Sequence, residues 1–119
     1  MQAKELKLLV IDALEDIKAE DIQVLDVTEM TDVTDLMIIA TGKSTRQVKA
    51  LANEVSQQVK AAGQQPLGVE GEDVGDWALV DLGDVIVHIM TPQTRMTYNL
   101  EKLWQVPDET DQQVSAEEE

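Results

Sequence analysis

Apolar residues recur at intervals of three and four in two long stretches of the chain, which is the spacing of one helical face. The first stretch predicts an amphipathic helix over residues 3–20, with an apolar face formed by Leu6, Val10, Ala13, Leu14 and Ile17. The second predicts a helix over residues 45–62, with a face formed by Val48, Leu51, Ala52, Val55, Val59 and Ala62. Ser44 and Gln47 fit an N-terminal capping box for the second helix, and Gly63 suits the position after its end.

Runs rich in apolar and β-branched residues predict four strands, over residues 22–27, 36–40, 77–81 and 85–90. The second run is apolar throughout, which is typical of a strand covered on both faces. The last two runs are joined through Leu82 and Gly83, which predicts a hairpin. The acidic stretch 66–76 contains three glycines and predicts a loop, with room for one short edge strand.

Thr91 and Pro92 predict the start of a last helix, because proline suits the first helical position. We expect this helix to end near Trp104 and to place on one face Met96, Leu100 and Leu103. Helices that alternate with hairpin-linked strands predict an α+β fold with the helices packed on a mixed sheet. We therefore expect one domain over residues 1–104, followed by an acidic, disordered tail over residues 105–119.

The chain is strongly acidic, because 24 Asp and Glu oppose 9 Lys and Arg among its 119 residues, giving a formal net charge of −15. This charge argues against generic binding to nucleic acid or to anionic membranes, both of which depend on Lys and Arg. It favours basic proteins as partners. The chain has no cysteine, and its first residues resemble neither a signal nor a transit peptide, so we expect a cytoplasmic protein.

The charges are unevenly distributed along the chain. Residues 61–94 contain no Lys or Arg but six acids, and we call this segment the acidic window; its acids are Glu70, Glu72, Asp73, Asp76, Asp81 and Asp84. Four of the nine bases come just before it, at Lys43, Arg46, Lys49 and Lys60. The acidic window is therefore the part of the domain best suited to face a basic protein.

A phosphate-binding loop is the first candidate for chemistry, because Gly42, Lys43 and Ser44 lie between a predicted strand and a predicted helix. The full P-loop motif requires another glycine at position 37. That position is Met37, inside the apolar strand, so no glycine-rich loop is available to wrap a phosphate. Helix capping explains the segment better than nucleotide binding, and we predict no cofactor.

The remaining candidates for chemistry are acids and one histidine. Asp81 and Asp84 are three residues apart across a turn, whereas a metal-binding pair on one strand needs a spacing of two; turn formation explains them better. Residues 70–73 lack the spaced acids of a calcium loop. His88 has no serine or cysteine motif beside it, which favours packing or protein contact. We predict no catalytic residue and no metal site.

The aromatic residues are Trp77, Tyr98 and Trp104. Trp104 follows a leucine at the end of an amphipathic helix, which favours a place in the core. Trp77 opens a strand after an acidic loop, a rim position where aromatic residues often anchor interfaces. For Trp77 and Tyr98, core packing and partner contact are equally open.

Two segments, TDLMIIATGKSTRQVKALANEV and PLGVEGEDVGDWALVDLGDVIVHIMTPQTRMTYNLEKLW, closely resemble the ribosomal silencing factor family, called RsfS or Iojap. The likeness covers roughly residues 3–104. Its specific motifs are the helix start at Ser44, the Val69-Glu70-Gly71 segment, Trp77, the turn over residues 81–84 and the ending over residues 98–104. The resemblance implies an α+β fold similar to that of nucleotidyltransferases, without their activity.

The resemblance further implies binding to ribosomal protein fourteen of the large subunit. The bound factor would block docking of the small subunit and so repress translation when nutrients are scarce. Family members are often homodimers when free, and the sequence leaves the oligomeric state open. Two other interpretations remain open beside this one: an enzyme of nucleotidyltransferase type, and a bare dimerisation or adaptor module.

With this partner, the acidic window becomes the expected docking surface. Trp77 would be the apolar anchor, and the partner's Lys or Arg would pair with Glu70, Asp81 and Asp84. Packing would come from Leu82, His88 and Met90. The rim would be closed by Arg95 and Tyr98.

Overall fold

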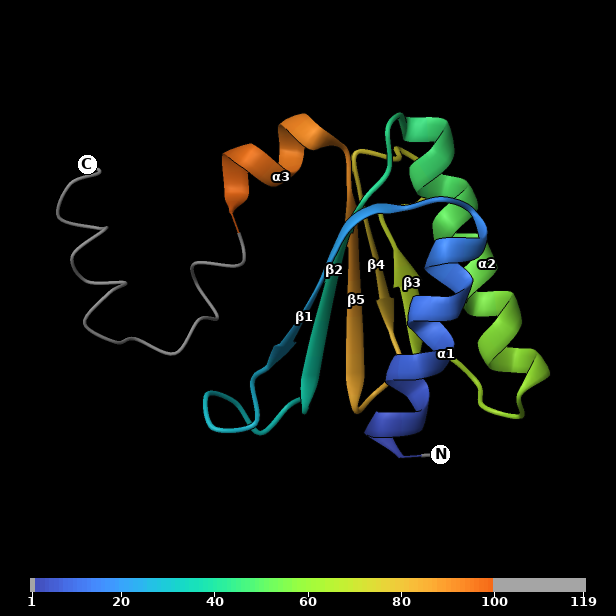
Figure 1. The fold of residues 1–119 in the computed structure, drawn as a ribbon, viewed down its shortest axis with the longest axis vertical. Coiled ribbons are helices and arrows are strands. Elements are labelled where there is room, and N and C mark those ends of the chain that lie inside the picture. The colour runs from blue at the N-terminus through green and yellow to red at the C-terminus, as the bar shows by residue number, and fades with distance from the viewer. Residues whose placement is uncertain (1, 100–119) are drawn as a thin grey trace, which may run out of the picture.

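The computed structural model describes residues 2–99 (Figure 1). In chain order, the elements are α1 (Ala3–Asp16), β1 (Glu20–Asp26), β2 (Leu36–Thr41), α2 (Thr45–Ala61), β3 (Gly68–Glu70), β4 (Trp77–Asp81), β5 (Val85–Met90) and α3 (Pro92–Tyr98). The five strands form one sheet in the order β1-β2-β5-β4-β3. β2 and β5 are parallel and the other neighbours are antiparallel, so the predicted α+β fold with a mixed sheet is confirmed.

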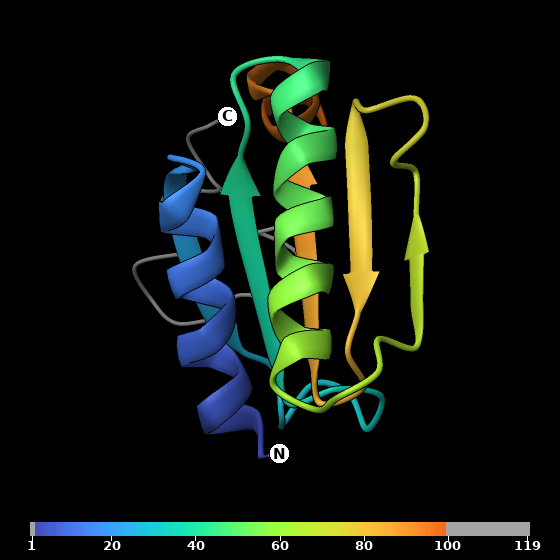
Figure 2. The same ribbon diagram turned by 90° about the vertical axis from the view of Figure 1, so that its right-hand side faces the viewer.

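Helices α1 and α2 lie side by side on one face of the sheet (Figure 2). We call this the helical face. The apolar positions that predicted the helices point into it, and Leu6, Val10, Val48 and Leu51 are fully buried. Alternate strand residues such as Ile38 complete the same core. Burial of each such side chain stabilises the fold by about 1.5–3 kcal/mol. This core therefore keeps the two helices packed on the sheet.

The opposite face of the sheet, which we call the second face, has a smaller apolar cluster. Val27, Met37, Ile39 and Met90 are buried there, and Trp77 packs against them. α3 lies on this side of the sheet, at the end where the chain leaves β5 (Figure 1). Both faces of β2 are therefore covered, as its uniformly apolar sequence predicted.

Several local predictions are confirmed. β4 and β5 form the expected hairpin, which turns through Gly83 with φ +88°. β3 is the short strand expected in the acidic loop, at an edge of the sheet. Gly63 follows the end of α2 with φ +97°, a conformation that glycine adopts without strain.

The predicted end of the first helix at residue 20 is wrong. α1 ends at Asp16, and Lys18 turns the chain with φ +62°. The amide of Ala19 donates to the Leu14 carbonyl, a closing pattern that usually has a glycine. Because a lysine takes the left-handed position, no glycine marked this end of the helix in the sequence.

The last helix also differs from its prediction. α3 ends at Tyr98, with Asn99 in the left-handed conformation at φ +46°. Met96 was expected on the packed face but is 81% exposed, whereas Arg95 is the buried residue of this helix. Leu100, Leu103, Trp104 and the tail 105–119 lie outside the described residues.

Candidate docking surface

The second face carries one row of paired residues that crosses four strands. Glu70 of β3 is paired with Leu79 of β4, and Leu79 is paired with His88 of β5. His88 is in turn beside Ile39 of β2. Paired residues on neighbouring strands point to the same side of a sheet. The acid at the sheet edge, the histidine and the apolar cluster therefore share one face.

Trp77 and His88 are directly linked on this face. The indole Nε1–H donates to Nδ1 of His88 over 3.0 Å, and the ring centroids are 5.8 Å apart. The Trp77 ring also packs against Tyr98 of α3, with centroids 4.9 Å apart and planes tilted by 46°. Trp77 is half-buried, and Tyr98 is 56% exposed. The three rings thus form an aromatic cluster with an exposed outer side.

The protonation of His88 follows from its position. Burial lowers the pKa of His88 to about 4, because desolvation disfavours the charged imidazolium. The ring is therefore neutral near pH 7. Nδ1 accepts from Trp77, so the ring proton is on Nε2. This histidine serves as a packed hydrogen-bond acceptor, in agreement with the packing role that the sequence favoured.

The acids of the window lie at different places along the sheet, and Asp81 and Asp84 are at the hairpin end, away from the aromatic cluster. Glu70 and Asp84 are exposed, and Asp81 is half-buried. Asp81 Oδ1 accepts from the Gly83 amide over 2.9 Å, which is the turn role proposed for this aspartate. Asp81 and Trp77 are at opposite ends of β4, roughly 13 Å apart along the strand.

Four of the residues expected at the docking surface are buried. Leu82 is 2% exposed and lies in the helical-face core, because it continues the alternation by which Ala78 and Val80 of β4 face the helices. Met90 is fully buried, and His88 and Arg95 are 7% and 8% exposed. In this conformation these four side chains can support a docking surface from below, but they offer a partner almost no area.

Arg95 fixes α3 to the two strands at one side of the sheet. Its Nη1 donates to the Asp21 carbonyl over 2.6 Å and to Thr41 Oγ1 over 2.8 Å. Its Nη2 lies 3.7 Å from the Asp21 carboxylate. Beside it is an open hollow of about 390 Å³, lined by Glu20, Asp21, Thr41, Pro92, Arg95, Met96 and Asn99. Arg95 thereby sets the position of the helix that presents Tyr98.

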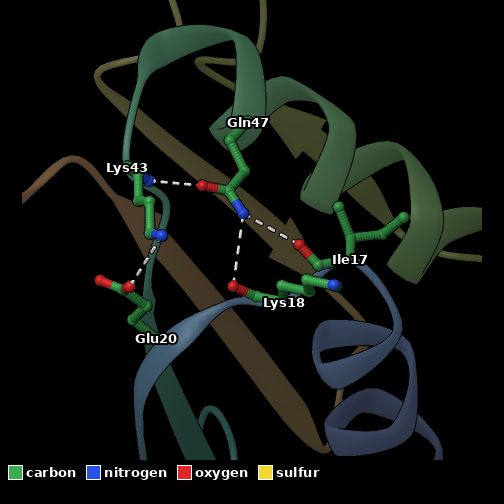
Figure 3. Close-up of polar contacts among 5 residues, drawn as sticks. All are labelled: Ile17, Lys18, Glu20, Lys43 and Gln47. Atoms are coloured by element: carbon green, nitrogen blue, oxygen red, sulfur yellow. Dashed lines mark hydrogen bonds and ion pairs between the residues drawn. The ribbon is translucent and has the colours of Figure 1, made fainter.

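A second polar junction joins the two helices of the helical face (Figure 3). Ser44 Oγ accepts from the Gln47 amide over 3.2 Å, as the capping box predicted. The other half of the box is wrong: Gln47 Oε1 accepts from the Lys43 amide over 2.7 Å, not from Ser44. Gln47 Nε2 also donates to the carbonyls of Ile17 at 2.9 Å and Lys18 at 3.3 Å. One side chain thus caps the start of α2 and the end of α1.

The described residues hold neither a metal cluster nor a membrane-spanning helix. Within residues 2–99, no three His, Cys, Asp or Glu side chains converge as a metal site would require. In the same part of the chain, no helix is long and apolar enough to cross a membrane. Gly42 is held by close packing, since a Cβ there would come within 2.9 Å of the Val48 side chain.

Comparisons with known proteins identify the family of the chain. A family described as "Ribosomal silencing factor during starvation" matches residues 1–119. Ribosomal silencing factor RsfS of Chromobacterium violaceum is 51% identical over 104 residues, which cover 87% of this chain and 85% of that protein. The chain belongs to the RsfS family.

The fold supports the same family assignment. A crystal structure of a protein from Chromobacterium violaceum matches with a TM-score of 0.86 and 50% identity, covering 91% of this chain and 92% of that one. The mouse protein "Mitochondrial assembly of ribosomal large subunit protein 1" is 38% identical, covering 83% of this chain and 46% of its own length. The resemblance recognised in the sequence is confirmed, and members of the RsfS family are named for a regulatory role in ribosome silencing.

Two parts of the site are not apparent from the sequence. The Trp77–His88 hydrogen bond joins residues eleven positions apart, and only the register of β4 on β5 brings them together. The anchoring of Arg95 to Asp21 spans 74 positions. The one signal for Arg95 in the sequence is that it is the first base after a long segment without any.

Proposed function

We propose that this chain binds ribosomal protein fourteen of the large ribosomal subunit and thereby blocks joining of the small subunit, which represses translation when nutrients are scarce. The family description, with its reference to silencing during starvation, supports the biological role. The mouse relative is named for the large ribosomal subunit, which supports the choice of subunit. The identity of the protein partner rests on the sequence resemblance.

One structural observation supports the docking surface more than any other. Tyr98 is more than half exposed and packs on Trp77, and Trp77 belongs to the acidic window, which has no Lys or Arg. Exposed aromatic pairs supply the apolar centre of many interfaces. Carboxylates around them favour a basic partner and repel others. Ribosomal proteins are generally basic because they neutralise RNA.

The exposure of individual residues supports different parts for them in the proposed surface. Trp77, Tyr98, Glu70, Asp81 and Asp84 have exposed area and are proposed as contacts. The buried residues act through them, since His88 holds the Trp77 indole and Arg95 holds the helix that carries Tyr98. Met90 and Leu82 pack beneath, on the second and the helical face respectively.

The proposed mechanism is steric and needs no chemistry. A bound domain of 13.2 kDa occupies space that the small subunit would have to enter. Silencing then depends on occupancy alone, and it is reversed when the factor dissociates. Because exposed charges act mainly on the association rate, added salt should slow binding more than it speeds dissociation.

Co-sedimentation with purified large subunits tests this proposal. The variant Glu70→Lys/Asp84→Lys changes two exposed acids of the window, and it should weaken binding by about tenfold or more. The matched control Asp12→Lys/Glu15→Lys makes the same change in charge on exposed positions of α1 and should bind within about twofold of the native chain. Equal losses in both variants would mean that net charge alone governs binding, which would contradict the proposed surface.

A further inference from the structure

The start of α2 carries an exposed basic surface that the proposed protein contact does not use. We define this basic patch by Lys43, Arg46 and Lys49, which are all exposed. They are three of only nine bases in a chain with 24 acids, and they fall within seven consecutive positions. The rest of the surface is dominated by carboxylates, so this concentration of positive charge is local.

The partners of these bases within the protein are few. Lys43 Nζ lies 3.4 Å from a Glu20 carboxylate oxygen, with both side chains more than half exposed. Among residues 2–99, neither Arg46 nor Lys49 forms an ion pair. Arg46 and Lys49 are three positions apart in α2, so their side chains are neighbours on the helix surface. The two cations are thus available to a ligand.

Helix stability does not explain the arrangement. The start of a helix favours acids and disfavours bases, because its free amides carry partial positive charge. Yet the first turn of α2 has no acid and begins with Thr45, Arg46 and Gln47. Arg46 in the first turn opposes the helix dipole, and Lys49 follows one turn later, while the protein has a large excess of acids to place there. Anion binding therefore explains the basic patch better than helix stability does.

The basic patch borders the proposed docking surface. A Cβ added to Gly75 would come within 2.8 Å of the Thr45 carbonyl oxygen and 3.1 Å of Lys49 Cε, so the loop before Trp77 lies directly against the start of α2. α3 and the start of α2 are also at the same end of the sheet (Figure 1). A partner bound at Trp77 and Tyr98 would bring its surroundings close to Arg46 and Lys49.

We propose that Arg46 and Lys49, assisted by Lys43, contact backbone phosphates of ribosomal RNA next to the bound ribosomal protein. This inference rests on the proposed function, since the large subunit is a nucleoprotein particle. Its surface beside any exposed ribosomal protein is dense with phosphates, and guanidinium and ammonium groups are the usual ligands of these. The net charge of −15 repels RNA at a distance, so the contact forms only once the acidic window is docked on protein.

The affinity for purified large subunits, measured against salt concentration, tests the inference. Arg46→Glu/Lys49→Glu should lower the affinity about tenfold or more and reduce the slope of log affinity against log salt by about 1 to 2, because each lost phosphate contact removes roughly 0.7–0.9. Acids at the start of a helix are favourable, so this variant keeps its fold. The control Lys60→Glu changes an exposed base in the last turn of the same helix, roughly 16 Å from Lys49 along the helix axis. This control should bind like the native chain.

A photo-crosslinking residue at position 46 distinguishes RNA from protein as the ligand. We expect a crosslinked product that ribonuclease destroys. A product sensitive only to protease, or native affinity of the Arg46→Glu/Lys49→Glu variant, would overturn the inference. If the native chain fails to bind large subunits at all, the proposed function fails; if it binds and this variant binds equally well, only the RNA contact fails.

Discussion

The Trp77 indole donates its hydrogen bond to Nδ1 of His88 over 3.0 Å, and this contact couples a buried histidine to the exposed aromatic cluster. Protonation of His88 would add a proton to Nδ1, so that this N–H and the Trp77 Nε1–H would face each other as two donors in a buried site. The link therefore connects the charge of one buried ring to the position of the exposed aromatic cluster.

Burial of His88 predicts a loss of stability in mild acid. The folded pKa of His88 is lowered to about 4, below the ordinary value of 6.5, so the unfolded chain binds the proton more tightly. The stabilisation is complete above pH 6.5 and is lost as the pH falls towards 4, by up to about 3 kcal/mol in unfolding free energy. Urea unfolding of the native chain and of His88→Gln between pH 7 and 5 measures it.

The comparison of these two proteins isolates the histidine, because His88 is the single histidine of the chain and ordinary carboxylates stay mostly ionised above pH 5. The native chain should lose stability over this range, and the variant should lose much less. Parallel curves for the two proteins would show that the titration of His88 does not affect folding.

Gln47 gives a prediction about the helix junction. Gln47→Ala removes the hydrogen bonds to the Lys43 amide and to the Ile17 and Lys18 carbonyls, and it should lower the unfolding free energy by about 1–3 kcal/mol. Gln47→Glu should also destabilise, although glutamate is normally favoured at this helical position, because its carboxylate would face two carbonyl oxygens. Thermal unfolding beside the exposed control Gln57→Ala tests both; a Gln47→Glu variant as stable as the native chain would contradict the bridging role.

Gly71 predicts a coupling between the acidic loop and Trp77. A Cβ at Gly71 would overlap the Trp77 carbonyl oxygen, and the residue has φ +78°. Gly71→Ala should therefore lower the unfolding free energy by about 2 kcal/mol or more and also weaken ribosome binding. The control Gly63→Ala has φ +97° but no neighbour within 4 Å, so only the backbone cost of about 1–2 kcal/mol applies, with binding unchanged. Equal effects of the two variants on binding would rule out this coupling.

Arg95 predicts that α3 and ribosome binding are linked. Arg95→Lys keeps the charge but cannot reach the Asp21 carbonyl and Thr41 Oγ1 in the same fork geometry. We expect weaker packing of Tyr98 on Trp77, seen as a change in near-ultraviolet circular dichroism, together with a lower affinity for large subunits. Retention of both signals in the variant would show that α3 is positioned by other contacts.

Most of the fold could be predicted from the sequence because its local signals agree with the final packing. Residues 36–40 are apolar throughout and become β2, an interior strand covered on both faces, and the periodic face from Val48 to Val59 becomes the buried side of α2. The signals failed where a residue took an unusual role. Lys18 follows the end of α1 in the left-handed conformation, where a glycine would have indicated the helix end in the sequence. Arg95 is the buried residue of α3, whereas Met96 was expected on the packed face.

The candidate surface was less predictable for a physical reason. Trp77, Glu70 and His88 share a face only because of the register between three strands, which sequence spacing does not determine. Leu82 was expected to contact a partner from its place beside the acidic turn, but it points into the helical-face core. The charge pattern located the segment, and the pairing of the strands determined which of its side chains are exposed.

Subunit joining tests the central claim most directly. Purified large subunits are incubated with the chain, small subunits are added, and the joined ribosomes are measured by sucrose-gradient sedimentation. We predict that the native chain lowers the joined fraction in proportion to its occupancy of large subunits, and that Glu70→Lys/Asp84→Lys does so only at concentrations higher by about tenfold or more. Undiminished joining of large subunits that have the native chain bound would contradict the account.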